Sequence, residues 1–542
     1  MDHEGLPNRR ATRASGDARL DSWKEIAAYF ARDVTTVRRW EKREGLPVHR
    51  LHHSKLSSVY AYASELDAWR ARRGKRPGAA EARLPRLAVL PLENLSRDPE
   101  QEYFADGMTE ALLTQLSGLH GLRVISRTSV MPFKGRHTNV QEIARCLAVE
   151  AVIVGTVTRS DSRIRITAQL VDGSSAENLW AHAYERELTD VLCVQREFAQ
   201  AIAQRIEIVV SRAERSRLAS ASAVGPVAFE SYLRGRFHLN KYTRAGLEDS
   251  VRHFERAIDL DPTYAPSHAS LAVACDLLGT FFIGLGPPSA MRAKAVAAAE
   301  TAIDLDPHVA SAHTVLGNAR QQEWQWTGAE AAHRRAIDLN PSDAIAHLGR
   351  AAFLAARGHL EDAVATAGHA REYDPLSLQT HAAIGVHLYF ARRYEEAISH
   401  FRSVQDLEPN HVWSLWHLGL ALLETARFDE AIEALTRAVA ASERSATPLG
   451  SLAMAYGRAG RDDEAQRILA ELEALRHTRY VPPAAYLHAY LGCPDRDRAF
   501  AALEEAYQER SYIMQFLAVL PLLDPLREDS RFVEMLQRLG LR

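Results

Sequence analysis

The sequence predicts three folded domains of different classes: a small basic domain of short helices and a β-ribbon, a mixed α/β domain, and a long all-helical repeat domain. A chain of 542 residues exceeds the size at which a single hydrophobic core stops growing, so several domains are expected. In the C-terminal half, a proline that closes similar segments recurs at intervals of 34 residues, which indicates helical repeats. Residues 1–86 hold 19 Lys/Arg against 11 Asp/Glu, a net charge of +8 in a chain whose total is −3. The basic end is therefore the part that favours contact with nucleic acid.

Changes in composition divide the chain into its expected domains. The first residues lack apolar periodicity, as disordered tails do, and two later stretches rich in small residues, proline or charge are typical of linkers. Between the linkers helices and strands alternate, and beyond the second linker only the helical period remains. The expected division is a disordered tail at 1–20, a DNA-binding domain at 21–73, a linker at 74–85, an α/β domain at 86–215, a linker at 216–227 and a repeat domain with a closing cap at 228–542.

Composition and cysteine usage favour a folded protein of the cytoplasm. The chain is 46% hydrophobic and 25% charged, within the ordinary globular range. The cysteines lie far apart, without the paired spacings of a zinc site or disulfide framework, which favours a reducing compartment; they are Cys146, Cys193, Cys275 and Cys493. No apolar stretch approaches the roughly 18 residues of a membrane span, and the N-terminus lacks a signal-peptide core. We expect a cytoplasmic protein with no metal, no cofactor and no membrane contact.

The first domain begins with signals for two short helices. Ser22 and Glu25 have the spacing of a capping box and open the amphipathic segment WKEIAAYFAR. Asp33 can cap a second helix, VTTVRRWEKRE, which Gly45 ends. Two short helices joined by a tight turn make a helix-turn-helix. The next segment, LPVHRLHHSKLSSVYAY, suits a β-ribbon, and Ser64 begins a third helix.

This order resembles the winged helix-turn-helix of MerR-like and excisionase-like bacterial regulators. The resemblance covers about 50 residues and rests on IAAYF in the first helix, TVRRWE in the second, GLP before the ribbon and ELDAW after it. It implies that the second helix enters the major groove while the ribbon, as a wing, lies along the adjacent backbone or minor groove. The implied contacts to double-stranded DNA are Thr35, Thr36, Arg38, Arg39, Lys42, Arg43, Arg50, His52, His53, Lys55 and Ser57. The alternative is that these charges merely solvate a surface.

Two further features of the first domain limit what it can do alone. His49, His52 and His53 lack nearby cysteine or carboxylate ligands in a recognisable spacing, so a metal site is not expected. A proline-containing linker follows, where many MerR proteins have a long dimerisation helix. A homo-oligomer is left open, and its contacts would have to come from elsewhere.

The middle segment predicts an α/β sandwich. It contains the strand RLAVLPLEN, the helix EYFADGMTEALLTQLSGL, the strand LRVISR, the helix VQEIARCL, three successive strands and a closing helix. In the strand RIRITAQLVDG, apolar and polar residues alternate as in a half-buried sheet. Asp106-Gly107 and Glu93-Asn94 could form a polar site, but turn and cap roles are favoured.

These segments resemble the FlgO-like or TolB-amino-terminal-like domain. Members of that group lie between a DNA-binding head and repeats in CadC-like regulators, or downstream of cyclase domains. The resemblance carries no catalytic residue. CadC-like proteins also have a membrane span, which this sequence lacks, so a signal is expected to arrive in the cytosol.

The repeats follow a fixed spacing. AIDLDP-like segments end at proline, and the last three intervals are 34 residues, whereas the first contains an 11-residue insertion near FFIGLGPPS; the prolines are Pro262, Pro307, Pro341, Pro375 and Pro409. Small residues keep the same register, as close helix pairs require: Gly317, Gly385, Gly419, Ala329, Ala363, Ala397, Ala431, Ala336, Ala370 and Ala438. The pattern resembles the tetratricopeptide repeat (TPR), which implies an all-α superhelix over about 228–540. The segment DPLREDSRFVEMLQRLGL is expected to be a closing cap helix.

The resemblance to TPR proteins also suggests where a partner binds. By family register, exposed aromatic residues of the groove would include Tyr389, Trp413 and Trp416, which would act as hot spots for a protein or peptide. The alternative is that the tryptophans pack between repeats.

The sequence therefore favours a transcriptional regulator that is not an enzyme. The chain contains no GxxxxGK[ST], GxSxG or HExxH motif and no protein-kinase set. The leading hypothesis is a DNA-binding regulator whose repeats couple a protein or peptide partner to the head. The alternative is a cytosolic TPR scaffold or adaptor, which would have no need of a basic second helix.

Overall fold

The computed structural model divides the chain into two compact units, residues 1–83 and 84–542. It describes residues 19–30, 34–35, 37–38, 41, 46–52, 57–62, 65–66, 84–96, 98–136, 138–160, 163–187, 190–206, 210–211, 214, 224–279, 288–493 and 495–541. Outside these residues lie positions 1–18 of the tail expected at 1–20, positions 74–83 of the linker expected at 74–85, and most of the linker expected at 216–227. The last two residues of the expected tail, Arg19–Leu20, form a strand. The two units are described separately.

The first unit contains a short helix and a three-stranded sheet. Its elements are β1 (Arg19–Leu20), α1 (Trp23–Tyr29), β2 (His49–His52) and β3 (Ser57–Tyr62). Both β1 and β2 pair antiparallel with β3, so the expected ribbon is present. Residues 34, 35, 37, 38 and 41 are helical.

The capping box predicted at Ser22 is present. Ser22 Oγ accepts a hydrogen bond from the Glu25 N–H at 3.2 Å, and the Glu25 carboxylate accepts one from the Asp21 N–H at 2.8 Å. The first bond satisfies an amide in the first turn of α1, where no intrahelical acceptor exists, and the second satisfies the amide of the residue that precedes the N-cap. One face of α1 packs on a small core of Ile26, Ala27, Val37, Leu46, Ala61 and Leu66.

The second unit begins with a six-stranded sheet. The strands are β4 (Arg86–Val89), β5 (Glu93–Asn94), β6 (Arg123–Val124), β7 (Ala151–Ser160), β8 (Arg163–Asp172) and β9 (Asn178–Glu187). Their order is β6-β4-β7-β8-β9, with β5 beside β7. β4 is parallel to β6 and β7, whereas β7, β8 and β9 form an antiparallel meander.

Helices cover one face of this sheet. In β8 the residues Ile164, Ile166 and Leu170 are buried, whereas Arg163 and Arg165 on the opposite face are exposed, which confirms the alternation predicted for this strand. The covering helices include α4 (Glu102–Ser117) and α7 (Val191–Arg205), which contact each other and the sheet. The short helices α5 (Arg127–Val130) and α6 (Val140–Leu147) complete the α/β domain.

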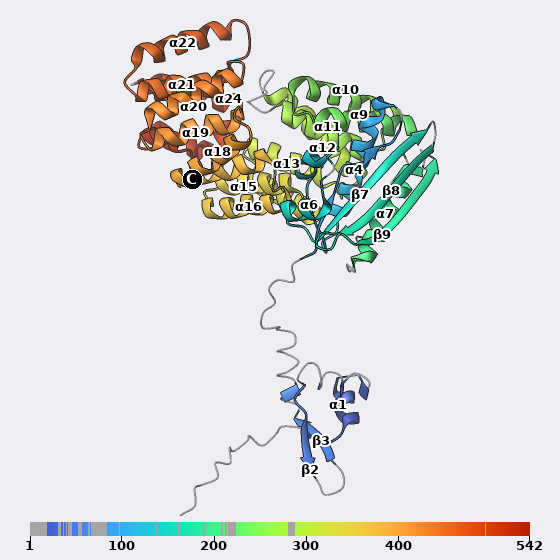
Figure 1. The fold of residues 1–542 in the computed structure, drawn as a ribbon. Coiled ribbons are helices and arrows are strands. Elements are labelled where there is room, and N and C mark those ends of the chain that lie inside the picture. The colour runs from blue at the N-terminus through green and yellow to red at the C-terminus, as the bar shows by residue number, and fades with distance from the viewer. Residues whose placement is uncertain are drawn as a thin grey trace, which may run out of the picture. The chain divides into compact units, whose positions relative to one another are not determined.

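The rest of the second unit consists of antiparallel helix pairs (Figure 1). The first helices of the pairs are α9 (Pro226–Leu239), α11 (Ala265–Leu278), α13 (Ala310–Gln322), α15 (Ala344–Ala356), α17 (Leu378–Phe390), α19 (Val412–Glu424), α21 (Ala446–Arg458) and α23 (Pro483–Leu491). The second helices are α10 (Arg244–Leu260), α12 (Pro288–Leu305), α14 (Trp326–Leu339), α16 (Leu360–Tyr373), α18 (Tyr394–Leu407), α20 (Phe428–Ala441), α22 (Asp462–Arg476) and α24 (Arg496–Gln508). Two 3-10 turns, η4 (Tyr512–Phe516) and η5 (Pro521–Leu526), and the helix α25 (Ser530–Arg538) follow.

The first helices of five successive pairs end in a turn that recurs with the 34-residue period. A residue with positive φ occupies this turn, with φ between 57° and 82°, at Trp324, Gly358, Arg392, Ala426 and Gly460. This left-handed position stops the first helix and reverses the chain. Only the two glycines adopt it without a steric cost to a side chain.

The small residues predicted between helices are where close packing needs them. A Cβ on Gly385 would lie 2.6 Å from the ring of Phe401, and one on Gly419 would overlap the Leu435 side chain. The paired helices therefore approach more closely than any larger residue at these positions allows. Within the part of the chain that the structure describes, no helix is long and apolar enough to cross a membrane.

Candidate functional site

The residues predicted to contact DNA are only partly visible. Thr35 and Arg38 are exposed on the helical stretch of the first unit, and Arg50 is exposed on β2. His52 lies on β2 and Ser57 on β3. The remaining predicted residues lie outside those that the structure describes: Thr36, Arg39, Lys42, Arg43, His53 and Lys55.

The exposed arginines are held by neighbours within the first unit. The Arg38 guanidinium lies 5.3 Å from the centre of the Trp23 ring, and Arg50 pairs with Glu41 at 2.5 Å. Val37, between Thr35 and Arg38, is fully buried. The helical stretch therefore has one side in the core and a polar side that carries Thr35 and Arg38.

His49 has a role in packing the sheet. Its Nε2 lies 2.6 Å from a Glu65 carboxylate oxygen, and its ring stacks on Tyr60 at 5.0 Å. Among the residues that the structure describes, no group of three histidine, cysteine or acidic side chains could hold a metal ion.

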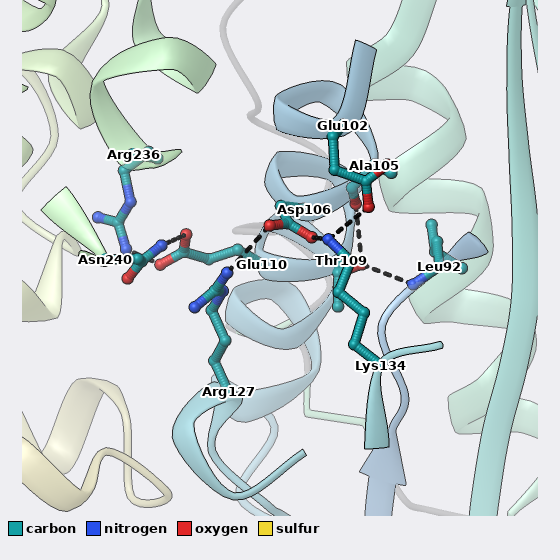
Figure 2. A network of polar contacts seen from close by, with 10 residues as sticks. All are labelled: Leu92, Glu102, Ala105, Asp106, Thr109, Glu110, Arg127, Lys134, Arg236 and Asn240. Atoms are coloured by element: carbon teal, nitrogen blue, oxygen red, sulfur yellow. Dashed lines mark hydrogen bonds and ion pairs between the residues drawn. The ribbon is translucent and has the colours of Figure 1, made fainter. Parts of the chain in front are cut away.

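A network of charged side chains connects α4 of the α/β domain with its surroundings (Figure 2). Asp106 is buried and pairs with Lys134 at 2.5 Å and with Arg127 at 3.4 Å. Lys134 also contacts Glu102 at 2.5 Å. Burial lowers the pKa of Arg127, and the nearby Asp106 carboxylate opposes this effect. Each charge in this part of the network has an opposite partner, which is typical of a structural joint.

The position of Asp106 differs from the turn or cap role expected for Asp106-Gly107. Both residues lie inside α4 rather than at its end. A Cβ on Gly107 would lie 2.6 Å from the Leu233 side chain, because α9 crosses α4 at this point. Sequence reasoning missed this because the partner helix is more than a hundred residues away. Asn94 does have the expected turn role, since its side chain bonds the backbone of Ser96 and Asp98.

The same network continues into the first repeat. Glu110 on α4 pairs with Arg236 of α9, and the Asn240 amide donates to Glu110 at 3.1 Å. Arg236 in turn donates to Ser270 at 3.1 Å. These contacts fix α4 against α9, as Figure 2 shows for Glu110, Arg236 and Asn240.

A second joint lies between the α/β domain and the C-terminal end of α16. Ser129 donates to the buried Asp374 at 2.6 Å, and Arg123 pairs with Glu372 at 2.6 Å. The Arg86 guanidinium donates to the Glu372 carbonyl at 2.7 Å. The α/β domain and the repeats are therefore parts of one compact unit. Burial raises the pKa of Asp374, and hydrogen bonds from serine hydroxyls oppose that shift.

Because of this joint, two acidic residues at the same position of successive repeats should contribute differently to the stability of the chain. We expect Asp374→Ala to lower the free energy of unfolding by about 2 kcal/mol, because it leaves buried serine hydroxyls without their acceptor. Glu408 lies 34 positions later and is exposed, so Glu408→Ala should change the free energy of unfolding by less than about 0.5 kcal/mol. Urea unfolding followed by circular dichroism measures both. Equal losses would show that the α/β domain adds nothing at Asp374.

The predicted partner-binding aromatics require a correction. Tyr389 is 0% exposed and Trp416 is 5% exposed, so neither is an open groove residue. Residues near the C-terminus cover Tyr389, with the Leu522 backbone against its hydroxyl. Trp416 packs between repeats, where its Nε1 donates to Ser451 Oγ at 2.7 Å. Trp413 is half-buried against His417, with ring centres 4.4 Å apart.

The comparisons with known proteins identify the repeats. A family model described as tetratricopeptide repeat matches residues 390–446. "Putative adenylate cyclase 3" of Rhizobium meliloti (strain 1021) is 38% identical over 189 residues, which are 35% of this chain and 32% of that protein. The chain therefore matches about a third of the length of this curated relative.

Several solved structures are similar at low identity. A thermophilic TPR protein of Thermus thermophilus, TTC0263, is 18% identical, with 36% of this chain and 99% of that chain covered and a TM-score of 0.31. YrrB, described as a TPR protein with an unusual peptide-binding site, is 19% identical over 35% of this chain and 91% of that chain, with a TM-score of 0.25. Human IFIT1 is 17% identical, with 64% of this chain and 77% of that chain covered and a TM-score of 0.41. Residues 390–446 therefore match the tetratricopeptide repeat, a class of protein-interaction module, and they lie within the longer series of helix pairs.

Proposed function

We propose that the chain is a DNA-binding transcriptional regulator whose TPR domain binds a protein or peptide partner. In this proposal the first unit is a winged helix-turn-helix, the middle domain is FlgO-like, and neither has a catalytic role. The observation that carries the proposal is the polar side of the helical stretch, where Thr35 and Arg38 are exposed beside the buried Val37.

The chemistry of the exposed residues supports contact with a duplex. Arginine can bind guanine through two parallel hydrogen bonds, and threonine and lysine can bind phosphates. Arg50 on β2 would contact the backbone from the wing and would exchange its surface pair with Glu41 for a phosphate. Residues 1–86 carry a net charge of +8, which attracts the phosphate backbone at long range.

The arrangement of the second unit supports a role in coupling. The α/β domain is joined to the repeats through Ser129–Asp374 and Glu110–Arg236. A partner that changes the conformation of the repeats would therefore also act on the α/β domain. In the chain, this domain stands between the repeats and the segment that leads from the first unit. TPR repeats bind proteins or peptides, so the signal we propose is a protein or peptide.

The test is binding of labelled duplex DNA by the full chain, followed by fluorescence anisotropy. We expect the triple substitution Arg38→Ala, Arg39→Ala and Lys42→Ala to weaken binding at least about a hundredfold, because each lost contact costs about 1 to 3 kcal/mol. A charge-matched control removes Arg444, Arg476 and Arg498 from the surface of the repeats, and it should bind as the unchanged chain does. Duplexes from the DNA upstream of the gene for this chain should bind more tightly than duplexes of random sequence.

The alternative function is an adaptor in which partner assembly by the repeats is the main activity. A folded full chain that binds no duplex, or that loses binding equally in the triple variant and its control, would favour this adaptor over the regulator.

A further inference from the structure

The inner surface of the repeats is formed by their first helices. Successive first helices contact one another directly along α11, α13, α15, α17, α19, α21 and α23. Each second helix from α10 to α22 packs against its own first helix and the next one. The first helices thus form the inner layer, the surface on which TPR proteins take up a peptide.

The chain's own C-terminal residues lie on this layer. η4 contacts α13 and α15, and η5 contacts α19. The cap helix expected from the sequence is present, because α25 packs on α24 through Arg531–Asp497 at 2.8 Å and Arg538–Glu504 at 2.6 Å. Residues 511–541 also reach earlier repeats, since η4 and η5 contact helices that precede the last pair. The chain end lies beside α15 (Figure 1), where Arg357 donates to the Gly540 carbonyl at 2.8 Å.

Successive turns of the repeats bind this segment through polar contacts. Trp326 Nε1 donates to the Leu539 carbonyl at 2.8 Å. In a later repeat, Arg392 forms a two-point ion pair with Asp524, at 2.6 and 2.8 Å. Two-point pairing of arginine with a carboxylate is geometrically selective.

Apolar side chains of the segment fill the surface between these turns. Phe516 is 4% exposed, and its ring centre lies 5.1 Å from that of Phe390 on α17. Met514, Leu517, Leu522 and Leu523 are buried as well. The segment therefore combines backbone carbonyls, an aromatic-aliphatic cluster and the Asp524 carboxylate, which together resemble a bound peptide ligand.

We propose that residues 511–541 are an internal ligand of the TPR domain, and that a partner binds the inner surface by displacing them. The partner is a peptide of the same chemistry, with an aromatic residue for the Phe390 site and a carboxylate for Arg392. This inference rests on the proposed function only in that the repeats bind a protein partner; it is independent of DNA binding.

The test uses the full chain with a site-specific protease sequence inserted between Arg510 and Ser511, where α24 has ended. After cleavage, a fluorescent peptide of residues 511–542 should exchange with the cut segment. The uncut chain should bind the peptide at least tenfold more weakly, because its surface is occupied.

Peptide variants identify the surface that is bound. Phe516→Ala should weaken competition about a hundredfold, because it removes a buried aromatic ring. Glu528 is exposed, so Glu528→Ala should compete within about twofold of the unchanged peptide. Exchange with this order of affinities supports the proposal. Loss of helix content on cleavage, absence of exchange, or equal competition by both variants would overturn it and make the segment an integral part of the fold. Duplex binding by the same cut protein reports separately on the proposed function.

Discussion

Gly450→Ala is expected to lower the free energy of unfolding by about 3 kcal/mol or more. A Cβ on Gly450 would overlap the carbonyl oxygen of Ala485, so α21 and α23 touch backbone to backbone. The obstacle is a helix backbone rather than a flexible side chain, and neither helix can move away without losing its packing. Urea unfolding followed by circular dichroism measures the loss.

Gly368→Ala is the matched control. Gly368 lies inside α16, and no atom beyond the adjacent backbone of its own helix lies within 4 Å of the Cβ that alanine would add. Alanine there should stabilise the chain by about 0.5 to 1 kcal/mol, because it restricts the unfolded chain and has the better helix propensity. Equal changes in the free energy of unfolding for both substitutions would contradict the backbone contact between α21 and α23.

Acidification from pH 7 to pH 5 is expected to cost the repeats several kcal/mol of stability. Burial lowers the pKa of His333, His387 and His488 to about 4 and that of His417 to about 3. An unfolded histidine titrates near 6.5. The stability from a histidine buried in its neutral form is present above pH 6.5 and is lost as the pH falls toward the folded pKa. At pH 5 each of these four histidines contributes about 2 kcal/mol less to the free energy of unfolding than at pH 7.

Buried acids act in the opposite direction, since burial raises the pKa values of Asp276, Asp343 and Asp374. For Asp276 the pKa rises to about 6, so the folded chain gains about 1 kcal/mol from this residue between pH 6 and pH 5. The gain from Asp276 offsets only a small part of the histidine loss. Urea midpoints at pH 7 and pH 5 measure the net effect, and His387→Leu should reduce the difference by about 2 kcal/mol. His477 is exposed, so His477→Gln is the control. Equal midpoints at the two pH values would contradict the buried neutral state.

The sequence predicts local features of the fold well, because nearby residues determine them. The capping box at Ser22 and Glu25 satisfies amides within one turn of helix, and the alternation in β8 reflects a sheet with one buried face. The 34-residue spacing predicts the helix pairs, because each pair repeats the same packing problem. Gly385 and Gly419 are small for the reason predicted, since a side chain of the paired helix fills their space.

The parts that sequence reasoning missed depend on contacts between distant residues. Tyr389 has the register of a groove residue, but residues more than a hundred positions later cover it. Asp374 and Glu408 occupy the same repeat position, yet only Asp374 meets the α/β domain through Ser129. No local pattern distinguishes the two, because the difference lies in a neighbour that the period does not encode.

The most direct test of the proposed function is the salt dependence of duplex binding by the full chain. Each phosphate contact that releases a counterion adds about 0.9 to the slope of log affinity against log salt. We expect salt-sensitive binding, with a slope reduced by about 3 when Arg38, Arg39 and Lys42 are replaced by alanine. A full chain that stays folded but binds no duplex, or whose slope is the same in the triple variant, would contradict it.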